Sequence, residues 1–156
     1  MNLKKKLVMV GLGLLVLVGS AFAHCEIPCG IYGDQARVDL IREHVTTVEK
    51  SMDMIDKLSK EKTPDYNQLV RWVNNKEIHA TMIQDIITQY FMFQRIKPAK
   101  ISDNEAYAEY IKKLELLHRI SVSAMKAKQG TEKSNTEDIL RDLKAFEAMY
   151  FEEHDH

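Results

Sequence analysis

Apolar residues recur at three- and four-residue steps along most of the chain after residue 35, a spacing typical of amphipathic helices. The first of these stripes predicts a helix over about residues 35–60, with Asp34 as its N-cap. Thr63-Pro64-Asp65 ends this helix, since proline restricts the residue before it to extended conformations. The apolar positions of the stripe are Val38, Ile41, Val45, Val48, Met52 and Ile55.

Three further stripes follow the first. The second begins at Leu69 and stops before Pro98, and the third runs from a cap at Ser102 or Asp103 to Gly130. The fourth covers residues 134–152. Four amphipathic helices joined by short turns predict an all-α fold, an antiparallel four-helix bundle over about residues 35–152 preceded by an irregular N-terminal segment. No repeat or second domain is evident, and residues 24–156 are expected to form one domain.

The N-terminus has the pattern of a secretory signal peptide. Lys4-Lys5-Lys6 precedes an apolar run over residues 7–18, and small residues at Ala21 and Ala23 form a cleavage site. The apolar run is shorter than the roughly 20 residues that span a bilayer. Cleavage after Ala23 is therefore expected to release an exported protein, periplasmic or extracellular, without stable membrane association, whose first residue is His24.

The charge of the chain argues against a nucleic-acid partner. Lysine and arginine number 22, and aspartate and glutamate 23. Residues 1–23 hold three lysines and no acid, so 19 basic and 23 acidic side chains remain after them, a net charge of −4. A domain without a basic excess is poorly suited to neutralising phosphates.

The expected mature N-terminus concentrates metal donors. His24 contributes an imidazole and the free α-amine, and Cys25 and Cys29 contribute thiols within the same six residues. Pro28 and Gly30 favour a turn between the cysteines. Nitrogen and sulfur donors suit Ni(II) or Cu(II) in a planar arrangement and zinc in a tetrahedral one.

A disulfide between Cys25 and Cys29 is the competing interpretation, because two cysteines in an exported chain normally pair. The loop between them is only three residues long, so the bridge would stabilise the fold weakly. The disulfide is also a plausible resting form of an empty metal site.

Other conspicuous residues have ordinary explanations. The methionines lie mostly on apolar stripes, where they fill the core. His44 and His118 are expected to be surface or boundary residues, since neither stands in an H-E-x-x-H frame. Trp72 indicates packing or an oligomer contact.

The segment HCEIPCGIY, residues 24–32, resembles the nickel hook of nickel-containing superoxide dismutases, whose pattern is H-C-x-x-P-C-G-x-Y at the processed N-terminus. The resemblance continues more weakly through Gln35-Ala36-Arg37 and Lys76-Glu77 to Tyr90-Phe91 and Lys97-Pro98. It implies an antioxidant enzyme with one nickel per subunit, superoxide as substrate, maturation by signal and processing proteases, and assembly as a hexamer.

The resemblance also implies a role for each hook residue. His24 ligates nickel through its amine and, in the oxidised state, through its imidazole. Cys25 provides a thiolate and a backbone amide nitrogen, and Cys29 provides a second thiolate. Tyr32 stands over the open face of the metal. The remaining hook residues shape the site, Pro28 through its turn and Glu26 through its backbone N–H near the substrate.

Two positions depart from the family pattern. Asp39 stands where the family commonly has a glutamate that orients the histidine ligand, and such a carboxylate fixes the imidazole tautomer. His79 stands at the position of a family arginine. The expected function is superoxide dismutation by Ni(II)/Ni(III) cycling. The alternatives are a non-enzymatic exported nickel- or copper-binding helical protein and a disulfide-closed helical binding module.

Overall fold

The computed structural model describes residues 32–152. The predicted signal peptide, residues 1–23, and the hook residues 24–31 lie outside this range, whereas Tyr32 lies within it. The elements are α2 (Asp34–Ser59), α3 (Tyr66–Asp85), the π-helix η1 (Ile86–Arg95), α4 (Asn104–Gln129) and α5 (Ser134–Glu152). The described part of the chain contains no strand, which confirms the all-α prediction.

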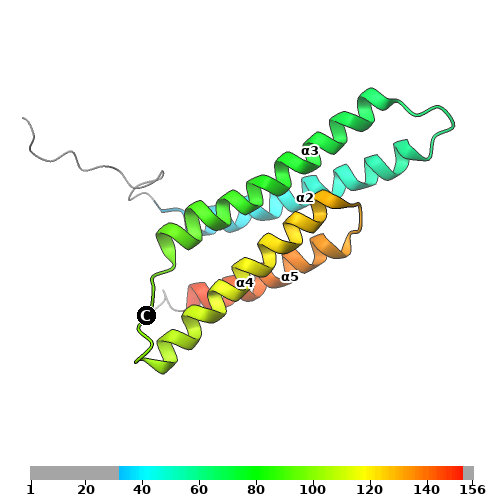
Figure 1. The fold of residues 1–156 in the computed structure, drawn as a ribbon. Helices are drawn as coiled ribbons and strands as arrows, with labels where there is room; N and C mark the ends of the chain where they lie inside the picture. The colour runs from blue at the N-terminus through cyan, green and yellow to red at the C-terminus, as the bar shows by residue number, and fades with distance from the viewer. Residues whose placement is uncertain (1–31, 153–156) are drawn as a thin grey trace, which may run out of the picture. The chain divides into compact units, whose positions relative to one another are not determined.

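The helices form two hairpins that pack together as an antiparallel bundle (Figure 1). One hairpin is α2 with α3, and the other is α4 with α5. Contacts of α3 with α4 and of α2 with α5 close the ring of neighbours. None of the described helices combines the length and the apolarity needed to cross a membrane.

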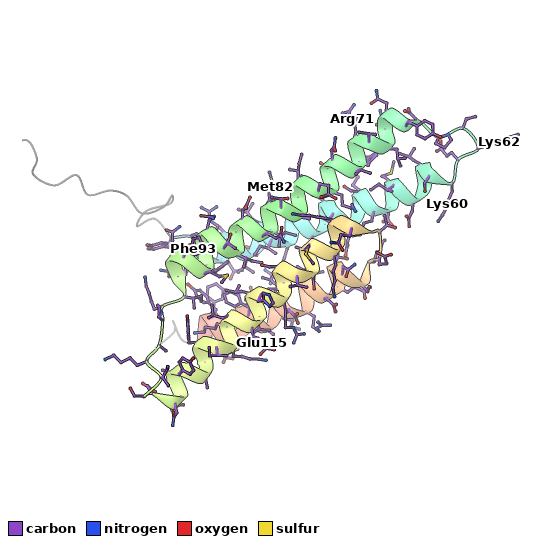
Figure 2. The ribbon with its side chains drawn as sticks, in the orientation of Figure 1. Lys60, Lys62, Arg71, Met82, Phe93 and Glu115 are labelled. Atoms are coloured by element: carbon purple, nitrogen blue, oxygen red, sulfur yellow. The ribbon has the colours of Figure 1, made fainter. Side chains whose placement is uncertain are left out.

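The core follows the predicted stripes of α2 and α5, whereas Ile111 and Met125, which belong to the predicted stripe of α4, are exposed. Its largest fully buried side chains come from all four helical segments and from η1. They include Ile41, Met52, Ile83, Ile87, Phe91, Leu117, Ile120, Ile139, Leu143, Phe146 and Tyr150. The stripe of α3 behaves differently in its first half, where Val70 and Val73 are exposed rather than buried. Met82 of α3 and Phe93 of η1 also project from the outer side of the bundle (Figure 2).

The structure confirms the predicted cap at Asp103 and contradicts the predicted cap at Asp34. The Asp103 carboxylate caps α4 by accepting a hydrogen bond of 3.2 Å from the backbone N–H of Ala106. Gly130 is the C-cap of α4. The prediction that Asp34 caps the first helix is wrong, because Gly33 is the N-cap and Asp34 is the first helical residue. Its carboxylate bonds to side chains from other elements instead.

The second predicted helix changes its winding before it ends. It is α-helical to Asp85 and then π-helical over Ile86–Arg95. The backbone N–H of Ile96 donates to the carbonyl of Phe91 at 2.8 Å, five residues earlier. The Gln94 side chain donates to the carbonyl of Gln89 at 2.8 Å, so a side chain satisfies one of the backbone acceptors. π-helical turns are rare and are found mostly at functional sites.

Candidate functional site

Tyr32 lies immediately before α2, between an aromatic ring and a cation. Its ring meets that of Tyr90 edge to face, with centroids 6.2 Å apart and planes at 69°. The Arg95 guanidinium carbon lies 4.2 Å from the centroid of the Tyr32 ring. Both contacts are favourable, because an aromatic face attracts ring edges and cations. These two contacts fix the position of the Tyr32 ring. The residue is nevertheless 46% exposed, so one side of it stays open to small molecules.

Asp34 is the centre of a hydrogen-bond network just behind Tyr32. Arg95 donates to both oxygens of its carboxylate, from Nε to Oδ1 at 2.9 Å and from Nη2 to Oδ2 at 2.7 Å. The Tyr150 hydroxyl donates to Oδ2 at 2.8 Å, and the Tyr90 hydroxyl donates to Oδ1. The network therefore ties the start of α2 to the end of η1 and to the last turn of α5.

The network changes the ionisation of its members. Burial alone would raise the pKa of Asp34, but the hydrogen bonds from Arg95, Tyr90 and Tyr150 prevail and lower it. Burial and the bond to Asp34 raise the pKa of Tyr90 to about 12, and the same two causes raise the pKa of Tyr150. The bond to Asp34 raises the pKa of Arg95. An ionised carboxylate, a charged guanidinium and two neutral phenols are thus the stable set at neutral pH.

The π-helical winding explains how two residues of η1 reach the same carboxylate. Tyr90 and Arg95 are five positions apart. An α-helix, at about 100° per residue, would place them about 140° apart around its axis. The wider turn with its i→i+5 bonds brings residues five apart closer together around the axis. Because both side chains contact Asp34, the winding of η1 is part of the construction of the site.

Arg37 adds a second cation beside Tyr90. Its guanidinium carbon lies 5.1 Å from the centroid of the Tyr90 ring. Its Nε is the only buried side-chain nitrogen or oxygen of the described residues that lacks a hydrogen-bond partner. A buried N–H without a partner costs about 1–3 kcal/mol.

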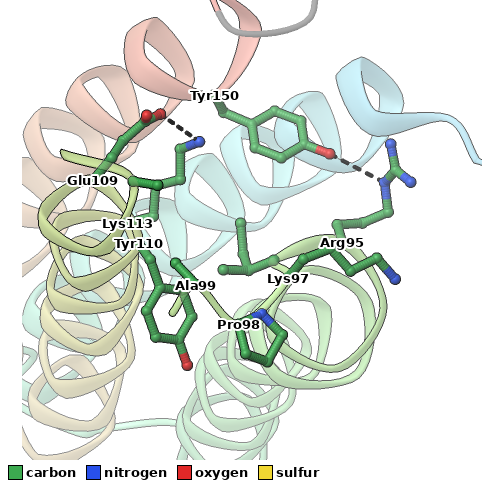
Figure 3. A pocket seen from close by; sticks show the side chains of 10 residues that line it. Arg95, Lys97, Pro98, Ala99, Glu109, Tyr110, Lys113 and Tyr150 are labelled. Atoms are coloured by element: carbon green, nitrogen blue, oxygen red, sulfur yellow. Dashed lines mark hydrogen bonds and ion pairs between the residues drawn. The ribbon is translucent and has the colours of Figure 1, made fainter. Parts of the chain in front are cut away.

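A cavity of about 210 Å³ adjoins the network on the side of α4 (Figure 3). Its charged and hydroxyl-bearing lining residues are Arg95, Lys97, Glu109, Tyr110, Lys113 and Tyr150. Glu109 and Lys113 form an ion pair of 2.7 Å. The Arg95 Nε donates to the Tyr150 hydroxyl at 3.0 Å at the border of the cavity. Cations outnumber carboxylates among these residues.

Comparison with known proteins decides the family. The model of the family described as nickel-containing superoxide dismutase matches residues 19–154. The chain belongs to this family. It is accordingly an oxidoreductase that acts on superoxide, with nickel as its metal. No curated protein and no solved structure gives a significant match.

The nickel ligands expected in this superoxide dismutase are all outside the described residues. His24, Cys25 and Cys29, together with Glu26 and Pro28, belong to the segment that the structure does not describe. Within residues 32–152, no three His, Cys, Asp or Glu side chains are grouped so as to hold a metal ion. The description of the site therefore concerns the residues around Tyr32.

Asp39 lies on the exposed side of α2. Its carboxylate accepts hydrogen bonds from Arg42 at 2.9 Å and from Gln35 at 3.1 Å. Arg42 and Gln35 also bind Glu147 of α5. The side chain of Asp39 is 56% exposed. Asp39 is not part of the Asp34 network, although it is on the same helix about one turn later.

His79 lies in the middle of α3 and contacts a histidine of α2. Its Nδ1 is 3.0 Å from the Nδ1 of His44. The position is 11 residues before Tyr90, which corresponds to about 16 Å along a helix. His79 is therefore not brought together with Tyr32 within one described subunit.

The sequence did not single out Asp34, Arg95 and Tyr150 as members of the site. Asp34 carries the ordinary signature of a cap, and Tyr150 falls on the apolar stripe of the last helix. Arg95 stands near the end of a helix, where a basic residue is common. The one available clue was Tyr90, whose hydroxyl must find a partner if the apolar stripe buries it.

Proposed function

We propose that this superoxide dismutase is exported, is processed by proteases to begin at His24, and binds one nickel ion in a hook formed by residues 24–32. In this proposal it disproportionates superoxide by Ni(II)/Ni(III) cycling in the periplasm or outside the cell. The observation that carries the proposal is the fixed position of Tyr32, the last hook residue, between Tyr90 and Arg95. Cys29 is three residues earlier, so its Cα lies within about 11 Å of that of Tyr32.

The donors of the chain fit nickel. His24 would supply the amine and imidazole nitrogens, Cys25 a thiolate and amide nitrogen, and Cys29 a second thiolate, a set that suits a tetragonal nickel site. Bound nickel supplies the one-electron redox couple, because thiolates and a deprotonated amide bring Ni(III) within reach.

The residues around Tyr32 are suited to a small anion. The overall reaction converts two superoxide ions and two protons into one dioxygen and one hydrogen peroxide. The Tyr32 hydroxyl can donate a hydrogen bond to superoxide at the open face, and Glu26 can present its backbone N–H beside it. Pro28 would hold the turn of the hook. Tyr90 and Arg95 keep the Tyr32 ring in one place, which orients its hydroxyl.

The local charge offsets the acidic character of the chain as a whole. Arg37 lies against the Tyr90 ring and Arg95 against the Tyr32 ring, and Asp34 neutralises the charge of Arg95. Lys97 lies nearby on the cavity wall. A net positive charge beside the open face attracts an anion and raises the association rate. These arginines supply the steering that the net charge of the chain does not.

Asp39 remains in the proposal as a residue that orients the His24 imidazole. Its carboxylate, on α2, accepts two hydrogen bonds. A hexamer, in which each short hook is covered by neighbouring subunits, is likewise proposed from the family.

The decisive experiment combines metal analysis, N-terminal mass spectrometry and a superoxide dismutation assay on protein from its native host. The expected result is one nickel per chain, an N-terminus at His24, and loss of both nickel and activity in Cys25→Ser. Full nickel binding without activity would support the alternative of a non-enzymatic metal-binding protein. A protein that is isolated with a Cys25–Cys29 disulfide and takes up no nickel after reduction would support the alternative of a disulfide-closed binding module.

A further inference from the structure

A pair of histidines faces each other across the α2–α3 hairpin. The Nδ1 atoms of His44 and His79 are 3.0 Å apart. Their ring centroids are 5.0 Å apart, with planes at 64°. Both residues are partly buried, so neither is sealed from solvent. Two ring nitrogens from separate helices thus lie within direct reach of each other.

We propose that His44 and His79 form a binding site for a divalent transition-metal ion, separate from the hook. Imidazole nitrogens bind such ions at about 2.0–2.1 Å. Two nitrogens at that distance are about 3.0 Å apart when the angle at the metal is a right angle, and about 3.4 Å apart when it is tetrahedral. The observed separation matches two adjacent ligands of one ion, with a shift of a few tenths of an ångström at most.

The contact between His44 and His79 also has a simpler explanation, a hydrogen bond in which one neutral ring donates to the other. The hydrogen bond and the metal site both need neutral imidazoles, because a metal binds the unprotonated nitrogen. Burial and the neighbouring His79 lower the pKa of His44, while Glu43 acts weakly in the opposite direction. The lowered pKa favours the neutral, metal-binding form of His44.

The chemistry of the pair sets which ions it accepts. Imidazole suits zinc, copper and nickel, and it suits magnesium and calcium poorly. No third His, Cys, Asp or Glu of residues 32–152 completes the set, so water or a group from another molecule must fill the other coordination positions. Such a site is open and exchanges its metal, unlike the closed sites that stabilise zinc domains.

The position of the pair keeps it distinct from the Asp34 network. His44 is ten residues after Asp34 on the same helix, which corresponds to about 15 Å. The site joins α2 to α3 near the middle of the hairpin. A metal ion bound there would cross-link the two helices and stabilise the folded state, since the unfolded chain does not hold the two histidines together.

The test uses the full chain carrying Cys25→Ser and Cys29→Ser, so that the hook thiolates do not contribute. Zinc chloride is the probe, and calorimetric titration counts the sites. His44→Gln and His79→Gln are each expected to remove the same site or to weaken it at least tenfold. His118→Gln is the matched control, because His118 is an exposed histidine of α4, and it is expected to keep the site.

Crystals of the unmutated chain soaked in zinc chloride provide a measurement that does not depend on the variants. Anomalous scattering at the zinc edge is expected to place an ion within bonding distance of both Nδ1 atoms. Absence of that ion at saturating zinc would overturn the proposal. The proposal would also be overturned if His44→Gln and His79→Gln bound as much zinc, and as tightly, as His118→Gln. The contact between the two histidines would then be only a hydrogen bond.

Discussion

Asp34 and Arg95 are 61 positions apart in the chain and bind each other through two nearly parallel hydrogen bonds, of 2.9 and 2.7 Å. One is the first residue of α2 and the other is the last residue of η1. Their side chains are only 14% and 20% exposed. A paired, bidentate contact of this kind fixes direction as well as distance, so it fixes the start of α2 against the end of η1.

Asp34→Asn is expected to destabilise the protein by about 2–3 kcal/mol, because it leaves the Arg95 charge largely buried without its counter-charge. Urea unfolding of the metal-free protein measures the change. Asp39→Asn is the matched control, since the exposed Asp39–Arg42 pair is worth at most about 1 kcal/mol. Equal losses in the two variants would mean that the Asp34 network contributes no more than a surface pair.

The same carboxylate predicts a dependence on pH. The pKa of Asp34 is below its ordinary value of 3.8 in the folded protein, so the ionised form favours folding. This contribution is present above the ordinary pKa and is lost as the pH falls through the lowered one. The difference in unfolding free energy between the unmutated protein and Asp34→Asn is therefore expected to narrow from about pH 5 downward. A constant difference over that range would contradict the assignment.

Tyr90 is expected to ionise late in an alkaline titration. Its pKa is raised to about 12 by burial and by the bond to Asp34, and that of Tyr150 is raised as well. Ultraviolet titration of the folded, metal-free protein should show tyrosines that ionise only well above pH 10. Tyr90→Phe should remove one of them. Tyr66→Phe, at a 70% exposed position, is the matched control and should leave the late-ionising tyrosines unchanged.

Tyr32→Phe separates the hydroxyl of Tyr32 from its ring. The ring contacts with Tyr90 and Arg95 survive in phenylalanine, so nickel content and stability are expected to stay unchanged. Loss of one hydrogen bond to the anion is expected to lower kcat/KM about three- to tenfold, as about 1 kcal/mol implies. Steady-state dismutation rates at matched nickel content provide the measurement. An unchanged rate would show that the hydroxyl has no part in the reaction.

Arg37→Gln is expected to reduce electrostatic steering. Superoxide is an anion, so kcat/KM should fall as salt screens the positive charge near Tyr32. The variant should show a lower rate at low ionic strength and a shallower dependence on salt. Arg71→Gln changes the net charge equally, 19 positions before Tyr90 on the same helical segment, and should leave the salt dependence intact. Identical salt profiles for the two variants would argue against local steering.

The sequence was sufficient for the fold because the relevant information is periodic. The stripe from Val38 to Met52 fixes the buried face of α2, and Asp103 marks the start of α4 by a local hydrogen bond. The prediction that the first half of the α3 stripe is buried was wrong. Periodicity shows that residues share one face of a helix, but it does not show that another helix covers this face. Val70 and Val73 share such a face and are exposed.

The site was accessible to sequence reasoning only where its residues are contiguous. Tyr32 stands in a motif of fixed spacing, so it could be named directly. Asp34, Arg95 and Tyr150 meet only after three separate elements have packed, and each has an ordinary local role that conceals the shared one. No local pattern in the sequence indicated the π-helical winding that aligns Tyr90 with Arg95.

Because η1 is π-helical, the number of residues between Tyr90 and Arg95 matters in addition to the identity of these two side chains. Deleting one residue between Tyr90 and Arg95 would shorten their interval to four positions, which an α-helix places about 40° apart around its axis. Both side chains would then share a face if the segment rewound from π to α. A deletion between α2 and α3 would fall in a surface turn and leave η1 unchanged. The interval of five positions from Tyr90 to Arg95 is therefore coupled to the helix type of η1, and insertions or deletions within it are expected to change that winding, whereas substitutions are not.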